Sequence, residues 1–274
     1  GNMRRMTFSA LGISDRLNKA LKHQVISSPT QIQEKAIPAV LKGEDIIAKA
    51  QTGTGKTLAF VLPILEKINT EDKAVQAQII TPTRGLAIQL TAEIKKFTDK
   101  LNDAGVLAIY GGQDVERQIK KLGRGIHIAV GTPGRILDHK RRETIDLSKV
   151  STLVLDEADQ MLQAGFHKDI EEIIAQTFDS RQTLLFSATI TNKVRDLTRK
   201  YMTNPKDITV QEKQITVEKI TQLVVETNDR AKQAALFRFL DEQRPFLPII
   251  FCRTKIRASR LFDAMKARKY AAQE

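Results

Sequence analysis

The chain has 274 residues, 41% of them hydrophobic, with a formal net charge of +12 and an isoelectric point of about 9.7. No apolar run approaches the roughly 18 residues that a membrane-spanning helix needs. A single cysteine, Cys252, excludes an internal disulfide and favours an intracellular location. The four histidines are scattered and lack cysteine partners at ligand spacing, which argues against a zinc site. The cationic excess favours a polyanionic partner such as nucleic acid, although many basic proteins have none.

Short apolar stretches with the composition of β-strands recur along the first two thirds of the chain. Helical patterns such as residues 86–101 and 170–178 separate most of these stretches, which cover residues 46–47, 77–80, 106–109, 126–130, 152–155 and 183–186. Buried strands that alternate with helices predict an α/β fold with a mostly parallel sheet and helices on both faces. Ligands bind such sheets at the carboxyl ends of the strands, so functional residues are expected directly after each stretch.

A change of pattern after residue 207 predicts a domain boundary. We expect a first domain over residues 1–207, a linker over 208–219 and the start of a second α/β unit over 220–274. That unit shows strand patterns at 222–225 and 247–251, with helices around 231–240 and from 256 on. Two strands cannot bury a sheet, so we expect the second unit to be incomplete in this chain. Gly1-Asn2 ahead of Met3 looks like the remnant of a tag.

The first functional motif is a phosphate loop between the stretch 45–48 and a helical pattern that starts at Leu58. Its residues are Gln51, Thr52, Gly53, Thr54, Gly55, Lys56 and Thr57. Glycines let backbone N–H groups approach an anion, and the helix N-terminus adds unpaired donors. Lys56 would reach the terminal phosphates and the Thr57 hydroxyl would bind Mg²⁺. Ala50 replaces the usual first glycine, and the alternative is a Gly/Thr-rich loop that happens to carry a lysine.

The second motif, Asp156-Glu157-Ala158-Asp159, follows the apolar stretch 153–155. A carboxylate at a strand end that faces a phosphate loop suits Mg²⁺ binding, so Asp156 would hold the metal, partly through water. Glu157 would accept a proton from the attacking water. The alternative is a solvated acidic turn.

Together these residues resemble the DEAD-box family of ATP-dependent RNA helicases. The resemblance also covers Pro29–Gln33, Pro82–Ala87, Gly111-Gly112, Thr132–Arg135 and Ser187–Thr189, in the family's order. It implies a RecA-like first domain and a second RecA-like unit that is incomplete here. It also implies RNA-stimulated ATP hydrolysis coupled to local unwinding of RNA duplexes, with ATP and Mg²⁺ as cofactors, RNA as partner and a cytoplasmic location. Protein partners remain unknown.

The resemblance assigns further roles in nucleotide binding and coupling. Gln33 would read the adenine edge with Phe8 packing on the base, whereas the plain alternatives are a surface helix residue and a core aromatic. Ser187 and Thr189 would link the nucleotide site to domain movement through hydrogen bonds to Asp159. Without the resemblance, both would be taken as caps of the following helix.

The residues expected to contact RNA lie in three loops. They are Pro82, Thr83 and Arg84, then Gly111 and Gly112, then Thr132, Pro133, Gly134 and Arg135. Hydroxyls, arginines and exposed amides suit sugar and phosphate oxygens and carry little sequence information, while 2′-hydroxyls would favour RNA over DNA. In isolation, Gly111-Gly112 and Pro133-Gly134 would be taken as plain turns.

The chain also departs from the family pattern. Gly85 stands where the family usually has Glu, and Val25 stands where the adenine motif usually begins with Gly. The first motif of the second domain is present at 251–254, but the later arginine-rich motif is missing, and Arg253, Arg257 and Arg260 do not match it. We therefore expect this chain to bind nucleotide weakly and to hydrolyse it poorly.

The alternatives to a helicase are a nucleotide-dependent RNA clamp and a phosphate-loop ATPase that acts on DNA.

Overall fold

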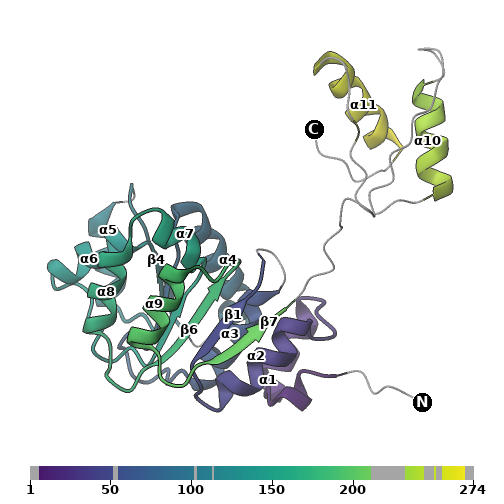
Figure 1. Ribbon diagram of the computed structural model, residues 1–274. Helices are drawn as coiled ribbons and strands as arrows, with labels where there is room; N and C mark the ends of the chain where they lie inside the picture. Colours follow the sequence, from purple (N-terminus) through teal and green to yellow (C-terminus); the bar gives the residue numbers. More distant parts are fainter. Residues whose placement is uncertain are drawn as a thin grey trace. The chain divides into compact units, whose positions relative to one another are not determined.

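The computed structural model describes residues 6–51, 55–101, 104–112, 114–210, 232–243, 250 and 255–268. The chain divides into two compact units, Gly1–Gln214 and Ile215–Glu274 (Figure 1). Among the described residues, no helix has the length and apolarity required to cross a membrane. The sites expected from the sequence lie in the first unit, apart from the motif at 251–254, which falls outside the described residues.

The first unit is built on a parallel sheet whose seven strands, among the described residues, follow the order β3-β4-β2-β5-β6-β1-β7. The strands are β1 (Ile46–Lys49), β2 (Ala77–Ile80), β3 (Val106–Ile109), β4 (Ile128–Gly131), β5 (Thr152–Leu155), β6 (Gln182–Ser187) and β7 (Lys206–Thr209). The predicted α/β fold with a parallel sheet is therefore confirmed.

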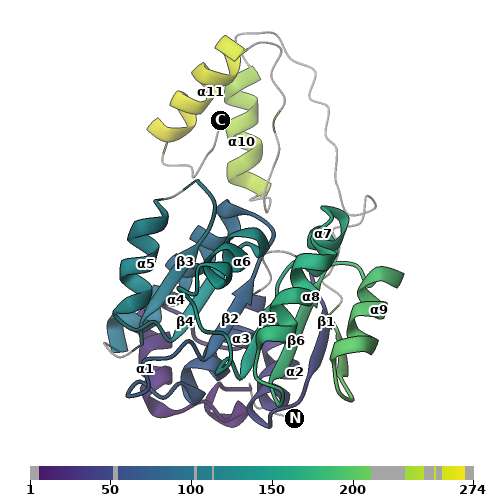
Figure 2. The ribbon, with the colours of Figure 1, turned by 90° about the vertical axis from the view of Figure 1, so that its left-hand side faces the viewer.

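Helices cover both faces of this sheet (Figures 1 and 2). One face packs against the 3₁₀ turn η1 (Ser9–Leu11), α1 (Asp15–His23), α2 (Gln31–Leu41), α3 (Lys56–Lys67) and α4 (Arg84–Leu101). The other face packs mainly against α6 (Pro133–Arg141), α7 (Ala158–Gln163), α8 (His167–Gln176) and α9 (Asn192–Tyr201), with α5 (Val115–Gly123) beside them. Strand residues alternate between the two cores: Val154 faces the first, and Leu153 and Leu155 face the second.

Strand β7 corrects the expectation that a linker begins at residue 208. Ile208 and Thr209 belong to this strand, which pairs with β1 in parallel register. Only Ile208 of the strand is buried, so its local sequence carries little apolar signal. Pairing with β1 supplies the strand conformation that the local pattern does not predict.

The described part of the second unit consists mainly of two helices, α10 (Lys232–Gln243) and α11 (Lys255–Ala267), near the predicted positions. Phe237 and Leu240 are buried, and the Arg268 guanidinium lies 4.3 Å from the centre of the Phe237 ring. The expected strand at 222–225 lies outside the described residues. So does the strand expected at 247–251, apart from Ile250, which is in neither a helix nor a strand.

Candidate nucleotide site and nucleic-acid interface

The strand order sorts the predicted functional residues into two groups at one edge of the sheet. The residues expected to contact RNA follow β3, β4 and β2, which are neighbours in the sheet. The residues expected to bind phosphate and Mg²⁺ or to couple the site to movement follow β5, β6 and β1, which are also neighbours. Phe8 and Gln33, expected to bind the adenine base, come before β1. Because all strands are parallel, both groups lie at their carboxyl ends, where ligands of such sheets bind.

The described part of the phosphate loop leads directly into α3. Gly55 is the N-cap residue with a φ of 76°, and no described side chain caps the helix. A Cβ at Gly55 would lie 2.8 Å from Gln33 Nε2, so a side chain does not fit there. The first N–H groups of α3 therefore keep the unpaired donors that an anion needs. Thr52, Gly53 and Thr54 lie outside the described residues, and Gln51 is exposed beside them.

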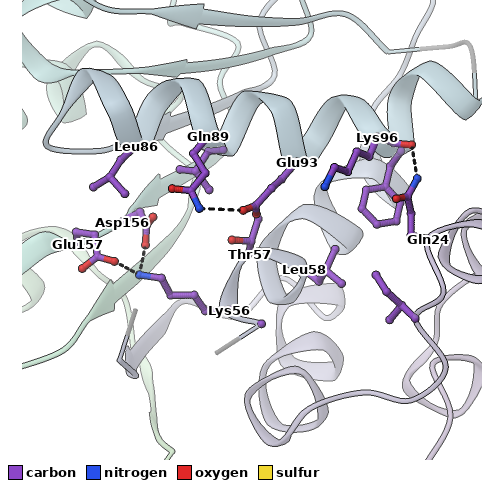
Figure 3. Close-up of a pocket in the computed structure, with 14 residues that line it drawn as sticks. Gln24, Lys56, Thr57, Leu58, Leu86, Gln89, Glu93, Lys96, Asp156 and Glu157 are labelled. Atoms are coloured by element: carbon purple, nitrogen blue, oxygen red, sulfur yellow. Dashed lines mark hydrogen bonds and ion pairs between the residues drawn. The ribbon is translucent and has the colours of Figure 1, made fainter. Parts of the chain in front are cut away.

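Lys56, the first residue of α3, ends between the two carboxylates that follow β5 (Figure 3). Its Nζ lies 2.9 Å from Asp156 Oδ1 and also contacts Glu157 Oε1. The three side chains are only 6%, 4% and 1% exposed. One ammonium thus faces two carboxylates, which leaves a net negative charge in a buried site.

The pKa values of Lys56 and Asp156 are both raised, for different reasons. Burial alone would lower the pKa of Lys56, but the charge of Asp156 and hydrogen bonds to both carboxylates outweigh it and raise the pKa. Burial raises the pKa of Asp156, and the charge of Lys56 opposes this only in part. Charge balance would favour an additional cation beside Asp156.

The donor set fits Mg²⁺ held together with phosphate oxygens. Asp156 Oδ1 is buried and forms an ion pair with Lys56 Nζ at 2.9 Å. The described residues contain no cluster of three or more His, Cys, Asp or Glu that would form a complete metal site. Mg²⁺ in phosphate-transfer sites is commonly bound by one or two carboxylates with phosphates and water. Asp156 and the nearby Thr57 hydroxyl suit that arrangement.

A cavity of about 380 Å³ opens from these charged residues, which is within the size range of small-molecule sites. It runs between α3 and α4 to Gln24 and Ile26, which follow α1 (Figure 3). Leu90 and Phe97 give it apolar walls, and Glu93 supplies a carboxylate. The sequence analysis missed this contribution of α4. The sequence signal that could have revealed it is the helical spacing of positions 86, 89, 90, 93 and 97, which places these residues on one face of α4.

Glu157 adopts an unusual backbone conformation. Its φ is 55° and its ψ is 48°, in the left-handed region that residues other than glycine seldom occupy. Its Oε2 atom accepts a hydrogen bond from Gln160 Nε2, and Oε1 contacts Lys56. Strained backbone of this kind is common at functional sites. Both carboxylate oxygens of Glu157 are thereby held in defined positions.

Gln33 and Phe8 are both buried. Gln33 is 2% exposed; its Oε1 accepts a hydrogen bond from Thr30 N–H at 2.9 Å, and its Nε2 donates to Gly55 O at 2.8 Å. Gln33 thus ties the start of α2 to the phosphate loop. Phe8, 3% exposed, packs in the core with α1 and α2. Neither residue lines the cavity, and their contact with a base stays a prediction.

Asp159 joins the loops that follow β5 and β6 through the hydrogen bonds expected from the resemblance. The Thr189 hydroxyl donates to Asp159 Oδ2 at 2.8 Å, and Thr189 N–H donates to the same oxygen at 3.2 Å. Ser187 Oγ accepts from Asp159 N–H at 3.1 Å and donates to Thr189 O at 2.7 Å. The coupling role of these residues stays a prediction.

Two of the three loops expected to bind RNA touch each other. The Arg84 guanidinium lies 5.2 Å from the centre of the Tyr110 ring, and its Nη1 is 3.2 Å from where a Cβ on Gly112 would be. Gly112 has a φ of 81°. The Thr83 hydroxyl accepts from Leu86 N–H and so caps α4, next to the half-buried Pro82. Tyr110 was not predicted, since a lone tyrosine after a strand carries no distinctive signal.

The third loop leads into α6. Thr132 precedes the helix, Pro133 occupies its first turn, and the exposed Gly134 has no described atom within 4 Å of where a Cβ would be. The Arg135 side chain is 15% exposed, and its Nη1 lies 3.9 Å from Asp138 Oδ2, too far for a hydrogen bond. This nitrogen is buried and has no hydrogen-bond partner among the described residues. Gly134 leaves open space for an incoming ligand.

Residues 30–197, more than half of the chain, match the model of the DEAD/DEAH box helicase family. The chain belongs to this family. It is 47% identical over 267 residues to the DEAD-box ATP-dependent RNA helicases CshA of Bacillus cereus and of Geobacillus kaustophilus. These alignments cover 97% of this chain and 51% and 57% of the two relatives.

A solved structure of a DEAD box protein from the hyperthermophile Methanococcus jannaschii is also similar to this DEAD/DEAH box chain. Its TM-score is 0.75 at 38% sequence identity, and the match covers 97% of this chain and 71% of that one. The chain spans about half the length of the curated relatives it matches.

Proposed function

We propose that this chain forms the nucleotide-binding part of an ATP-dependent RNA helicase. In that role, ATP hydrolysis would be stimulated by RNA and coupled to local unwinding of RNA duplexes. The observation that carries the proposal is the buried Lys56 ammonium between Asp156 and Glu157 at an uncapped helix N-terminus. The names of the CshA relatives support the same activity. The cytoplasmic location expected from the family resemblance is part of this proposal, which names no protein partner.

The residues have distinct tasks in ATP binding. The first N–H groups of α3 hold phosphate oxygens, and Lys56 turns from Glu157 to the terminal phosphates when ATP enters. Asp156, with Thr57, would hold Mg²⁺, partly through water. When bound, Mg²⁺ neutralises charge on the phosphate oxygens. Movement of Lys56 frees Glu157 Oε1 from its ion pair.

Glu157 then serves as the general base. Its Oε1 accepts a proton from the water that attacks the terminal phosphorus, while the bond to the bridging oxygen of ADP breaks. In the resting arrangement the same oxygen contacts Lys56, so the base is engaged until the lysine moves. Glu157 therefore becomes available as a base once Lys56 has moved to the phosphates.

RNA would bind across the ends of β3, β4 and β2. Arg84 and the exposed backbone of Gly111, Gly112 and Gly134 would contact phosphate and sugar oxygens. Asp159 would transmit the state of the nucleotide site through its hydrogen bonds to Ser187 and Thr189. A clamp that binds RNA without unwinding would share these contacts, and separation of a short labelled duplex distinguishes the two functions.

The proposal is tested by equilibrium binding of a fluorescent ATP analogue with Mg²⁺. Lys56→Ala should weaken binding at least tenfold, because it removes the cation that contacts the phosphates. Lys95→Ala removes an exposed lysine of α4 that does not line the cavity, and should leave binding unchanged. Equal affinities of the Lys56→Ala and unaltered chains would contradict the proposal.

A further inference from the structure

A buried polar pair lies behind the RNA loops and has no role in the function proposed so far. His139 on α6 is 0% exposed and Gln118 on α5 is 1% exposed. His139 Nε2 lies 2.6 Å from Gln118 Oε1, and His139 Nδ1 lies 2.8 Å from Thr144 Oγ1. Gln118 Nε2 donates to the backbone oxygen of Tyr110 at 3.3 Å. The pair therefore joins two helices to the end of strand β3.

The hydrogen-bond roles follow from the amide of Gln118. Because its Nε2 donates to Tyr110 O, its Oε1 is left as the acceptor that faces His139. Burial, and then the charge of Arg135, lowers the pKa of His139, so the ring is neutral near pH 7. The network therefore assigns the single ring proton to Nε2, which donates to Gln118.

The pair connects elements that carry all three RNA loops. Tyr110 directly precedes Gly111-Gly112, and its ring lies beneath the guanidinium of Arg84 from the loop after β2. His139 belongs to α6, whose first turn carries the third loop. A continuous set of contacts thus runs from α6 through Gln118 to Tyr110 and Arg84. The strand ladder ends at Ile80, Ile109 and Gly131, and beyond it Thr132 N–H of the third loop still donates to Ile109 O at 3.0 Å.

We propose that Gln118 and His139 are positioning residues that fix the spacing of the three RNA-binding loops. The inference rests on the proposed function, because it assumes that these loops bind RNA. A single RNA strand presents its phosphates at regular intervals, so loops held at a fixed spacing bind it without first being ordered. The competing explanation is that the pair only stabilises the domain. A positioning role predicts that loss of the pair weakens RNA binding, whereas a purely stabilising role does not.

His127 supplies a matched control. It is also a buried histidine, 7% exposed, and it precedes β4 at the end of the sheet opposite to the RNA loops. Its Nδ1 accepts from Gly105 N–H at 2.8 Å and its Nε2 lies 3.1 Å from Thr70 O. Replacement of His127 thus removes comparable buried hydrogen bonds at a distance from the proposed interface.

The test measures the Kd of a fluorescein-labelled single-stranded RNA by fluorescence anisotropy. Gln118→Met keeps the side-chain length and removes both hydrogen bonds, so we expect a Kd about three- to tenfold higher, the effect of one or two such bonds. Affinity for the ATP analogue should not change. His127→Gln should change the RNA Kd by no more than about twofold, even if it lowers the melting temperature as much as Gln118→Met does.

Two further variants keep the test valid if Gln118→Met fails to fold, and they test whether Gln118 and His139 act together. Gln118→Asn keeps the amide but is too short to reach both partners, so it should also weaken RNA binding. If the pair acts as a unit, Gln118→Met combined with His139→Leu should bind RNA no more weakly than the weaker single variant. Amide hydrogen exchange at Gly111 and Gly112 should be faster in the Gln118 variants than in His127→Gln.

The outcomes separate this inference from the proposed function. If the unaltered chain binds no RNA, the proposed function is overturned and the inference with it. If the unaltered chain binds RNA and the Gln118 variants bind equally well, only the inference is overturned. A loss of RNA affinity in His127→Gln as large as in Gln118→Met would also overturn it, since stability alone would then explain both.

Discussion

At the scale of single residues, Val25 combines high exposure with an unfavourable backbone conformation. Its φ is 58° and its side chain is 90% exposed, so no packing offsets the strain. A β-branched residue in the left-handed region is a genuine outlier. Val25 also stands at the rim of the cavity, between Gln24 and Ile26, which both line it. The family resemblance places a glycine at this position, and the backbone angle gives the physical reason.

Val25→Gly should therefore stabilise the first unit. Relief of the left-handed strain is worth about 1–2 kcal/mol, and the greater freedom of glycine in the unfolded chain offsets about 0.5–1 kcal/mol of it. We expect a net gain of about 0.5–1 kcal/mol in urea unfolding. Val25→Ala keeps the Cβ and should gain little. A loss of stability in Val25→Gly would show that the strain is absent.

Glu157→Gln separates ATP binding from hydrolysis. Glutamine keeps the shape of the side chain and an acceptor for Gln160, but it is too weak a base to take a proton from water. ATP-analogue binding should persist, while the rate of phosphate release should fall about 10²–10⁴-fold, and the RNA-bound state should accumulate. Glu172→Gln on α8 changes an exposed carboxylate and serves as the control. Normal turnover by Glu157→Gln would mean that another group is the base.

At the scale of elements, helix α4 begins with a residue that weakens it. Gly85 lies in the first turn, is exposed, and has no described atom within 4 Å of where a Cβ would be. Gly85→Ala should add about 1 kcal/mol of stability through helix propensity, measured by urea unfolding. Gly112→Ala is the contrasting change, because its φ of 81° and the nearby Arg84 make a Cβ unfavourable. Equal effects of the two changes would contradict this reasoning.

The elements also show which features the sequence can predict. The helix that starts at Lys56 and the position of the carboxylates at the end of β5 were predictable, since each follows an apolar strand and precedes a helix. That this site binds phosphate stays a prediction. Strand β7 was not, because Ile208 is its one buried residue and pairing with β1 determines its conformation. Gln118 and His139 were also missed, because an isolated polar residue in an amphipathic helix looks solvated until the partner helix is known. The β-strand order, which separates the two halves of the site, depends on long-range packing that no local pattern encodes.

At the scale of the whole molecule, the strand order separates two kinds of chemistry along one edge of the sheet. The half formed by β5, β6 and β1 carries buried, paired charges around Lys56 and Asp156. The half formed by β3, β4 and β2 presents exposed groups such as Arg84 and Gly134. Exposed cations are screened by salt, whereas buried pairs are much less so. RNA binding and nucleotide binding should therefore respond differently to ionic strength.

RNA affinity should fall steeply with salt, in keeping with the net charge of +12. For single strands, the slope of log K against log salt is about −0.7 for each phosphate neutralised. Arg84→Gln should make that slope shallower by about 0.7 and weaken binding at low salt. The measurement is a fluorescence-anisotropy titration of labelled RNA at several salt concentrations.

Arg141→Gln is the control for this titration, because Arg141 is exposed at the far end of α6, away from the RNA loops. It lowers the net charge by the same amount as Arg84→Gln. If only the total charge of the molecule attracts RNA, the two variants should change the slope equally. If RNA lies across the ends of β3, β4 and β2, only Arg84→Gln should change it, since counterion release occurs where phosphate is contacted. Equal slopes in the two variants would place the RNA elsewhere on the surface.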